Sequence, residues 1–500
     1  MLRTKRFYHR LAWLLLAAMC SACWKNQPQS PDADALLTQC ERDLDAPPPA
    51  VNGAQCGSLT VPVDAGNPAL GEIEVYLKRW PAISAVKDAD PVFVIAGGPG
   101  QSATYVSDSL SQAFFNLRKK RDIIFVDQRG TGDSAPMHCD DYSQDPLTVL
   151  HQDRQAQLLD DLRQCAQTHQ TLAPYVTTPY AVADLEAVRQ ALGYDRINLW
   201  GGSYGTRVAL EYARRHRQVV RSVVLDGAAP VAIALPFTMG ESAGQALQAV
   251  AGQCMDSEAC FSRYGNPVHN AEAIARQLSV APVTVDIAHP LTGLPQTVVL
   301  DADKFAALIR MALYDRLASK VLPHLLASAA ENDFRLLAKV VSQLLSSGDF
   351  SQLAMGMHFS VICTEDAQYP HPSEPKAFLQ VDLSELMLQV CEFWPKGQLP
   401  ADYYQSFEAD VPALILSGQR DPVTPPAWGQ SVADQLSQST HIIAPGGHHG
   451  VTSQGCGSQL VTQFIRNLTL TEKEQACAEN IQPFAPYLSA EKSQEAGETP

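Results

Sequence analysis

The sequence predicts an α/β protein in which a mostly parallel central sheet carries helices on both faces and a helical cap is inserted above it. Three observations predict this class. Short apolar segments alternate with helical segments, two alternating strands precede them, and a long helix-rich stretch interrupts the alternation. The expected strands are residues 59–63, 73–77, 92–96, 123–126, 197–200, 223–225, 413–416 and 442–443.

The expected cap spans residues 236–405, where the strand rhythm stops. This stretch is rich in helix formers and lies between two core strands, so we interpret it as a roof over the top of the sheet. The sheet core is then divided into residues 51–235 and 406–488. The clearest helical segments are residues 180–192 in the core and 241–254, 302–313 and 334–345 in the cap.

The chain begins with the pattern of a secretory signal over residues 1–22. A basic start precedes an apolar stretch that is too short to span a bilayer. Ser21, Ala22 and Cys23 resemble the end of a bacterial lipoprotein box, so Cys23 is a candidate for lipidation. The alternative is a cleaved signal that releases a soluble periplasmic protein. Residues 23–50 form a linker, and the polar residues 489–500 are expected to be disordered.

Charge and cysteine content agree with an exported protein of the periplasm or cell envelope. The formal net charge of −16 is unfavourable for binding nucleic acid or an anionic membrane surface, so a lipid on Cys23 would be the membrane contact. Apart from Cys20 and Cys23, ten cysteines remain, and neighbours in sequence suggest five disulfides. The expected pairs are Cys40–Cys56, Cys139–Cys165, Cys254–Cys260, Cys363–Cys391 and Cys456–Cys477. Neither a C-x-x-C pair in the mature region nor an H-E-x-x-H motif is present, so we expect no metal and no cofactor.

A G-x-S-x-G motif at residues 201–205 contains the candidate nucleophile, Ser203. The motif follows the apolar strand 197–200 and precedes a helical stretch. A serine on such a strand-to-helix turn is lifted above the sheet and lies at a helix N-terminus, which favours developing negative charge. A glycine-rich loop that happens to contain serine is the alternative.

A serine nucleophile needs a base and an acid, and both follow in the expected order. Asp421 follows the strand 413–416, and a histidine loop follows the next strand. His448 and His449 are adjacent, and we favour His449 because the glycine after it gives a loop residue room to turn inward. The rival acid is Asp226, which also follows an apolar strand.

A glycine-rich loop at residues 97–100 is the candidate oxyanion hole. It follows the strand 92–96, where curled backbone can direct N–H groups at a substrate carbonyl. We expect the donors to be the N–H groups of Gly98 and Tyr204. A tight glycine-proline turn without a catalytic role is the alternative.

Taken together, five motifs resemble the α/β-hydrolase peptidases of the prolyl aminopeptidase and tripeptidyl aminopeptidase group, which includes a TAP-like C-terminal region. The resemblance covers residues 50–485 approximately. It implies the α/β-hydrolase fold and a serine exopeptidase with the triad Ser203, Asp421 and His449. Two departures concern Ala96, where the group often has histidine, and His448, where it usually has glycine. The motifs are GGPG at 97–100, DQRGTGDS at 127–134, GSYG at 202–205, RDPVTP at 420–425 and HG at 449–450.

An aminopeptidase must recognise a free α-ammonium, and a carboxylate in the cap would do so. Our candidate is Glu365, ahead of Asp366, and the resemblance supports an acid at this position. The alternative is a solvated acidic pair beside a disulfide. Asp127 and Arg129 are left out of the site, because Arg129 is expected to tie core loops together by hydrogen bonds.

Three functions compete. We favour an exported serine exopeptidase that hydrolyses bonds near free peptide N-termini through an acyl-enzyme on Ser203, as prolyl or tripeptidyl aminopeptidases do. The alternative in the same fold is a carboxylic-ester hydrolase with the same triad. A non-catalytic binding protein on a hydrolase fold is the third.

Overall fold

The computed structural model describes residues 36–41, 50–139, 154–345, 353–370, 372, 374–405 and 409–489. The expected signal segment, Cys23, most of the 23–50 linker and all but the first residue of the 489–500 tail lie outside these ranges. None of the helices in the described ranges is both long and apolar enough to cross a bilayer.

Within the described residues, nine strands form one sheet in the order β1-β2-β3-β5-β4-β6-β7-β10-β11. The strands from β5 to β11 in this order run parallel, while β1, β2 and β3 form an antiparallel edge. All eight expected strands are present, and the two-residue β1 was not predicted. The strands are β1 Thr38–Gln39, β2 Gln55–Pro62, β3 Glu72–Trp80, β4 Val92–Ile95, β5 Ile123–Val126, β6 Ile197–Gly202, β7 Val220–Asp226, β10 Ala413–Gly418 and β11 Ser439–Ala444.

Helices cover both faces of this sheet because its strands are apolar on both sides. In β4, Phe93 and Ile95 pack into the core beneath one face, whereas Val92 and Val94 pack into the core of the other. The first face is covered by α5 (Thr178–Ala191), α6 (Tyr204–Arg215) and α15 (Pro426–Ala433), and the second by α3 (Ala103–Arg118) and α16 (Gly457–Asn467). Short helical segments are η1 Pro68–Leu70, η3 Ala173–Tyr175, η4 Arg217–Val219, η6 Val451–Ser453, α17 Glu472–Gln475 and η7 Ala476–Asn480.

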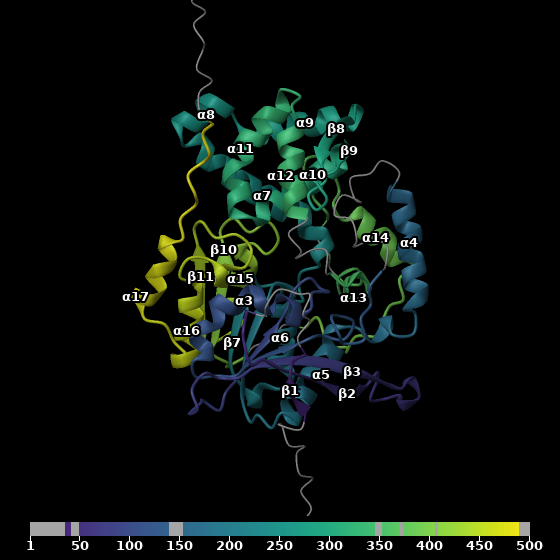
Figure 1. Ribbon diagram of the computed structural model, residues 1–500, viewed down its shortest axis with the longest axis vertical. Helices are drawn as coiled ribbons and strands as arrows, with labels where there is room; N and C mark the ends of the chain where they lie inside the picture. The colour runs from purple at the N-terminus through teal and green to yellow at the C-terminus, as the bar shows by residue number, and fades with distance from the viewer. Residues whose placement is uncertain are drawn as a thin grey trace, which may run out of the picture.

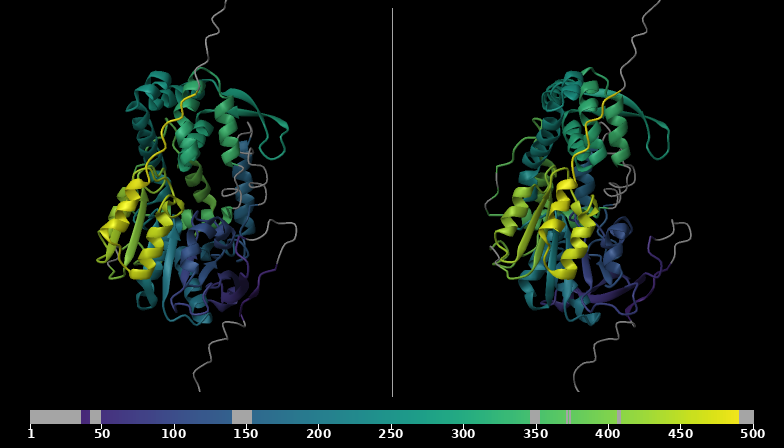
Figure 2. Two further views of the ribbon diagram at one scale, coloured as in Figure 1. Left: turned by 60° about the vertical axis from the view of Figure 1, so that its left-hand side comes forward. Right: turned by 90° about the vertical axis from the view of Figure 1, so that its left-hand side faces the viewer.

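A separate helical part lies above the sheet in Figure 1, and the turned views of Figure 2 show the same arrangement. It has its own apolar core, as a cap of this size requires. Its helices are α7 Leu235–Met255, α8 Glu258–Tyr264, α9 Pro267–Val280, α10 Ala302–Tyr314, α11 Arg316–Ala330 and α12 Arg335–Leu345.

The cap is not purely helical, which corrects the sequence-based expectation. A hairpin of β8 (Val283–Ala288) and β9 (Pro295–Leu300) forms a two-stranded antiparallel sheet within it. Val285 and Val298 are buried in the cap core, while alternate residues of both strands face outward. This period-two pattern is short and lies among helical segments, so the sequence did not predict the hairpin.

A second helical layer joins the cap to the first part of the core. It contains α13 (Met355–Val361), the π-helical turn η5 (Ile362–Asp366) and α14 (Glu385–Phe393). Helix α4 (Arg154–Thr168) precedes β6 in sequence, yet it packs beside α14 rather than on the sheet. The roof is therefore built from two separate segments of the chain.

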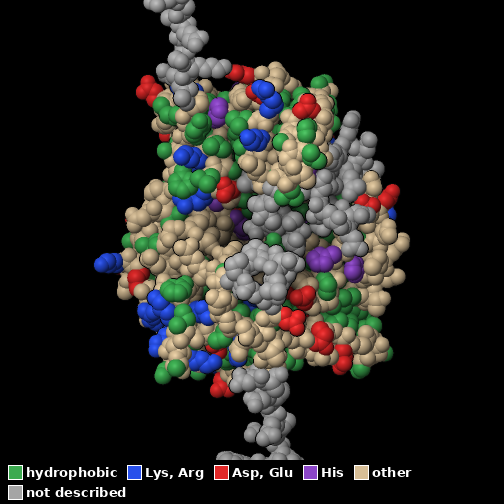
Figure 3. All heavy atoms as spheres, in the orientation of Figure 1, with side chains coloured by type: hydrophobic (Ala, Val, Ile, Leu, Met, Phe, Trp, Pro, Cys, Tyr) green, Lys and Arg blue, Asp and Glu red, His purple; other side chains and the backbone are tan. Residues whose placement is uncertain are grey.

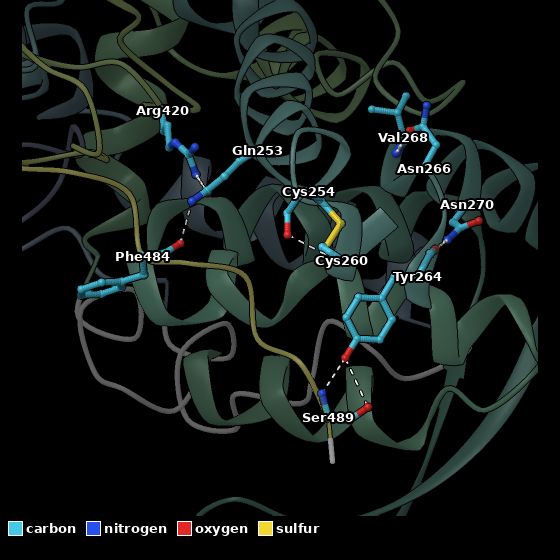
Figure 4. The surroundings of a disulfide bond; sticks show 11 residues. Gln253, Cys254, Cys260, Tyr264, Asn266, Val268, Asn270, Arg420, Phe484 and Ser489 are labelled. Atoms are coloured by element: carbon cyan, nitrogen blue, oxygen red, sulfur yellow. Dashed lines mark hydrogen bonds between the residues drawn. A yellow bond between two sulfur atoms is a disulfide. The ribbon is translucent and has the colours of Figure 1, made fainter. Parts of the chain in front are cut away.

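The structure confirms all five expected disulfides, Cys40–Cys56, Cys139–Cys165, Cys254–Cys260, Cys363–Cys391 and Cys456–Cys477. Near one of them, the C-terminal segment crosses from the sheet to the cap (Figure 4). The Gln253 side chain donates to the Phe484 carbonyl at 3.0 Å, and the Ser489 N–H donates to the Tyr264 hydroxyl at 2.8 Å. These contacts hold the end of the described chain against α7 and α8.

Candidate active site

Ser203 lies on a sharp bend between β6 and α6. Its φ of +54° lies in a region that residues other than glycine seldom adopt, and it caps the N-terminus of α6. A Cβ on Gly205 would lie 2.3 Å from the Ile95 carbonyl oxygen, and one on Gly201 would lie 2.4 Å from the Gly205 carbonyl oxygen. The glycines of the motif are therefore required by the close approach of β6, α6 and β4.

Asp421 and His449 meet above the carboxyl ends of β10 and β11. The His449 Nδ1–H donates to Asp421 Oδ2 at 2.8 Å. The same oxygen accepts from the Thr424 hydroxyl at 2.7 Å, and Oδ1 accepts from the Val423 and Thr424 N–H groups at 2.8 and 2.9 Å. Because its carboxylate is held by four donors, Asp421 is fixed in position to orient the imidazole.

The alternatives from the sequence have other partners. His448 is buried, and its Nδ1 hydrogen-bonds the Leu313 carbonyl at 2.7 Å. Asp226 accepts from the N–H groups of Val451 and Thr452, each at 2.7 Å. Asp226 therefore holds the backbone that follows the histidine loop, and the structure pairs His449 with Asp421.

The local electrostatics favour an anionic acid beside a basic histidine. Burial opposes charge on Asp421, yet His449 and the hydrogen bonds from Thr424 hold the pKa of its carboxyl below the usual value. Burial would lower the pKa of His449, but Asp421, with a smaller effect of Asp226, raises it above the usual value. Burial raises the pKa of Asp226 itself.

The backbone of Asp226 and Gly227 connects the serine bend to the imidazole. The Ser203 N–H donates to the Asp226 carbonyl at 2.8 Å. A Cβ on Gly227 would lie 3.2 Å from Cε1 of His449. Ser203 and His449 therefore contact neighbouring peptide units at the end of β7, so the structure brings all three predicted triad residues to one edge of the sheet.

The loop at residues 97–100 runs past the nucleophile. A Cβ on Gly97 would lie 3.0 Å from Cβ of Ser203, and Gly98 is exposed with a φ of +105°. Tyr204 is the first residue of α6, so its N–H has no partner one turn earlier in the helix. Tyr204 thus follows Ser203 directly in the chain, and Gly98 follows Gly97, the residue that lies beside Ser203.

The cap holds this loop from the opposite side. The imidazole Nδ1 of His358 in α13 hydrogen-bonds the Pro99 carbonyl at 3.0 Å, and the Ala354 N–H donates to the Gly100 carbonyl at 2.9 Å. Because both carbonyls are engaged from the cap, the peptide units between them are fixed relative to the serine.

Family models match two parts of the chain. Residues 90–253 match the α/β hydrolase fold, and residues 377–477 match a TAP-like protein. This chain has the α/β-hydrolase fold. The first matched segment contains the bend at Ser203, and the second contains the loops of Asp421 and His449.

Curated relatives of the hydrolase are named as peptidases. Serine protease Hip1 of Mycobacterium tuberculosis is 25% identical over 454 residues, which cover 83% of this chain and 85% of the relative. The tripeptidyl aminopeptidase of Streptomyces coelicolor is 30% identical over 201 residues, covering 37% and 36% of the two chains. The proline iminopeptidase of Neisseria meningitidis serogroup B is 31% identical over 154 residues, covering 31% and 37%. The hydrolase is thus a serine hydrolase with peptidase relatives.

Glu365 lies in a buried ionic cluster of the hydrolase, so the alternative of a solvated acidic pair is wrong. Its carboxylate accepts from the Thr178 N–H at 2.6 Å, the Thr178 hydroxyl at 2.8 Å and the Tyr403 hydroxyl at 2.5 Å. The Arg207 guanidinium lies 3.4 Å from Glu365 and 2.9 Å from Asp366. Burial raises the pKa of the Glu365 carboxyl, which Arg207 partly offsets.

This cluster touches the nucleophile helix. The Thr178 hydroxyl also hydrogen-bonds the Tyr204 hydroxyl at 2.9 Å, and Arg207 lies one turn after Ser203 in α6. Glu365 is therefore linked by one threonine to the residue whose N–H is an expected oxyanion donor. The π-helical turn η5 supplies both carboxylates of the cluster.

Asp127 and Arg129 have supporting contacts. Arg129 donates to Asp184 at 2.6 and 2.7 Å and to the Val63 carbonyl at 2.8 Å, which confirms its expected role between core loops. Asp127 accepts from the Ser102 hydroxyl and the Thr104 N–H at 2.7 and 2.9 Å, and so fixes the start of α3 behind the oxyanion loop.

Four residues of the site were not singled out from the sequence. Thr424 binds Asp421, and His358 binds the oxyanion loop. Tyr403 binds Glu365, and the ring of Tyr314 lies 5.6 Å from that of His449. Of these four, only Thr424 could have been found from the sequence, because it lies in the RDPVTP motif that contains Asp421. Among the described residues, no group of three or more potential ligands could hold a metal ion.

Proposed function

We propose that the hydrolase is an exported serine exopeptidase that cleaves peptide bonds near free N-termini through an acyl-enzyme on Ser203. The observation that carries this proposal is the 2.8 Å contact of His449 with Asp421 beside the backbone that also holds Ser203. The peptidase names of the curated relatives favour amide substrates over esters.

The proposed reaction follows from the roles of these groups. His449 takes the Ser203 proton as the oxygen attacks the carbonyl, and the N–H groups of Gly98 and Tyr204 stabilise the oxyanion. The imidazolium, stabilised by Asp421, then protonates the leaving amine as the bond breaks. Water deprotonated by His449 hydrolyses the acyl-enzyme and restores Ser203.

We propose that Glu365 provides charge for recognition of the substrate ammonium. Two carboxylates, Glu365 and Asp366, face the single guanidinium of Arg207, so the cluster has one formal negative charge in excess when both are ionised. This excess favours a cation nearby even though protein donors already occupy the carboxylates.

The amine role predicts a substrate-dependent effect of Glu365→Gln. The variant should raise KM for peptides with a free N-terminus and leave N-blocked esters with the same acyl group almost unchanged, because only the former carry the ammonium. Steady-state kinetics on both substrates tests this. An equal loss on both would refute the amine role and leave Glu365 as a structural group behind Tyr204.

A peptide library tests the function itself. Incubation with purified hydrolase should release short N-terminal fragments, identified by mass, and a fluorophosphonate probe should label Ser203. The Ser203→Ala variant should lose both, whereas Ser109→Ala, an exposed serine in α3, should keep both. Preferential cleavage of short acyl esters over proline or alanine anilides would favour the esterase alternative.

We propose that the hydrolase works in the periplasm or cell envelope. Five disulfides support an oxidising compartment. Cell fractionation tests export, and a Cys23→Ser variant tests the lipid anchor. If Cys23 is lipidated, the variant should move from the membrane fraction to the soluble fraction.

A further inference from the structure

Two adjacent histidines contact the same end of a cap helix. His448 is buried, and its Nδ1–H donates to the Leu313 carbonyl at 2.7 Å. Because a carbonyl can only accept, the Nδ1 atom of His448 carries the proton. The ring of Tyr314, the last residue of α10, lies 5.6 Å from that of His449 and packs edge-on against it. The end of α10 therefore contacts both the triad imidazole and its neighbour in the chain.

Both sides of the His448 contact are anchored. Leu313 is buried in the apolar core of the cap, and its carbonyl belongs to the last turn of α10, where no later N–H of the helix can reach it. On the other side, the Arg420 N–H donates to the Gly447 carbonyl at 2.9 Å, and the Gln454 side chain donates to the His448 carbonyl at 3.2 Å. The imidazole of His448 thus joins a fixed point of the cap to a fixed loop of the core.

The triad chemistry does not require an imidazole at position 448. One histidine is enough to move the serine proton, and Asp421 is hydrogen-bonded to His449. The peptidases that this chain resembles usually have glycine at the position of His448, and glycine has no side chain that could reach the cap. The contact with Leu313 is therefore an addition of this chain to the common triad.

The Tyr314 ring covers one side of the triad imidazole. The His449 side chain is 18% exposed, and Figure 3 shows a recess between the helical upper part and the lower part of the molecule, with histidine side chains visible inside it. Burial lowers the pKa of His449, Asp421 and Asp226 raise it, and Arg310 lowers it. If the end of α10 moved away, water would solvate the imidazolium and the pKa of His449 would rise.

The groups around His448 keep its imidazole neutral. Burial lowers the pKa of this histidine, and Arg420 and Arg316 lower it further, whereas the Leu313 carbonyl and Asp421 raise it. The net shift is downward, so the ring is uncharged at neutral pH. The contact with the cap therefore depends on the Nδ1–H donor and not on a charge.

We infer that His448 is a positioning residue that fixes the end of α10 against the histidine loop and thereby holds the Tyr314 ring against His449. The inference rests on the proposed function and deepens it, because it makes the setting of the triad base depend on docking of the cap. Proton transfer from Ser203 is then efficient only while α10 lies on the loop.

A nearly isosteric pair of substitutions isolates the hydrogen bond. His448→Asn keeps a side-chain N–H close to the position of Nδ1, whereas His448→Leu fills a similar volume without a donor. In a pH series of kcat/KM, His448→Leu should shift the acid limb to higher pH. It should also lower the plateau by about tenfold to a hundredfold, since a small displacement of a catalytic group is costly. His448→Asn should restore most of both properties.

A double substitution tests whether His448 acts through Tyr314. Tyr314→Ala should shift the acid limb in the same direction as His448→Leu, because it also uncovers the imidazole. In the Tyr314→Ala background, His448→Leu should cause little further shift, since no ring remains to be positioned. Shifts that simply add would overturn the inference.

His441→Leu is the control for the loss of a half-buried histidine. Its imidazole contacts the Ser417 hydroxyl at 2.9 Å and the Gln430 side chain at 3.1 Å, and both partners belong to the core. Denaturant unfolding should show a loss of stability in this variant, while the acid limb stays where it is in the wild type.

Fluorophosphonate labelling of Ser203 separates this inference from the proposed function, because labelling needs the triad but no particular peptide. The labelling rate should fall in His448→Leu and recover in His448→Asn. Equal rates and equal acid limbs in these two variants, or the same shift in His441→Leu, would overturn the inference and leave the peptidase function intact. A wild-type protein that neither labels at Ser203 nor cleaves any peptide would overturn the proposed function, and the inference with it.

Discussion

At the scale of single residues, the site depends on how buried polar atoms are satisfied. The Asp421 carboxylate has donors on both oxygens, so it remains anionic in an apolar environment and can hold the His449 tautomer. Asp226 lies nearby and also follows a strand, but its oxygens accept from the backbone of Val451 and Thr452. Hydrogen-bond partners, rather than residue type, decide which aspartate serves the histidine.

The direction of the His449 pKa shift predicts the pH profile. Activity requires a neutral imidazole, so the raised pKa of His449 places the acid limb of kcat/KM at a higher pH than an unperturbed histidine would give. Asp421→Asn removes the main stabilising charge, and the acid limb should move to lower pH. The rate should fall by roughly 10⁴ because the amide no longer fixes the productive tautomer.

A pH series of kcat/KM on the wild type and Asp421→Asn checks this. Asp410→Asn, at an exposed aspartate, is the control and should retain the wild-type profile. An acid limb that does not move in Asp421→Asn would assign the titration to another group.

At the scale of elements, the site is made by strand ends that meet at one edge of a parallel sheet. The bend after β6 requires glycine because α6 starts against the carbonyl oxygens at the end of β4. The cap contributes from the other side, through contacts of α13 with the oxyanion loop and of Tyr314 at the end of α10 with the imidazole. Each element supplies one part of the geometry.

The close approach at Gly205 predicts a destabilising Gly205→Ala variant. Its Cβ would lie 2.3 Å from the Ile95 carbonyl oxygen and 2.7 Å from that of Ala96, so β4 and α6 must move apart. The free energy of unfolding should fall by about 1–3 kcal/mol, with loss of activity, because backbone cannot yield like a flexible side chain.

Gly244→Ala in α7 is the matched control. Nothing lies within 4 Å of its Cβ position, and alanine is the better helix former by about 1 kcal/mol. Denaturant unfolding should therefore show equal or greater stability with full activity. Equal losses in both variants would contradict the close approach as the cause of the loss at Gly205.

At the scale of the whole molecule, two layers with separate apolar cores enclose the site. The lower layer contains the sheet, and the upper part has its own core of helices and one hairpin. The Cys139–Cys165 and Cys363–Cys391 disulfides lie in a third cluster, where α4 packs beside α14 under the roof. The acidic chain thus surrounds a site beside which two carboxylates, Glu365 and Asp366, face the single guanidinium of Arg207.

Loop length predicts which disulfide matters more for stability. The Cys363–Cys391 bridge spans 28 residues and the Cys254–Cys260 bridge spans 6. Replacing both cysteines by serine should cost about 3.5 kcal/mol for the longer loop and about 2 kcal/mol for the shorter one, from chain entropy alone. Denaturant unfolding of the two double variants tests this order, and a reversed order would show that native contacts dominate.

Much of the fold could be predicted from sequence because its signals are local. Apolar strands, the glycine bend at Ser203 and the order of the triad all follow from short patterns, and neighbouring cysteines indicated the five disulfides. The β8–β9 hairpin was missed because its short alternation, with Val285 facing inward, lies within a helix-rich stretch. The placement of α4 could not be predicted, since it depends on packing against α14, which is distant in the chain.

The sequence by itself determined the residue types that can do the chemistry and the strands that carry them, because both depend on neighbours within a few positions. Only the tertiary structure decided that His449 rather than His448 meets Asp421 and that Glu365 is buried. Those outcomes depend on contacts between segments distant in the chain, and such contacts are set by the packing of the cap on the sheet.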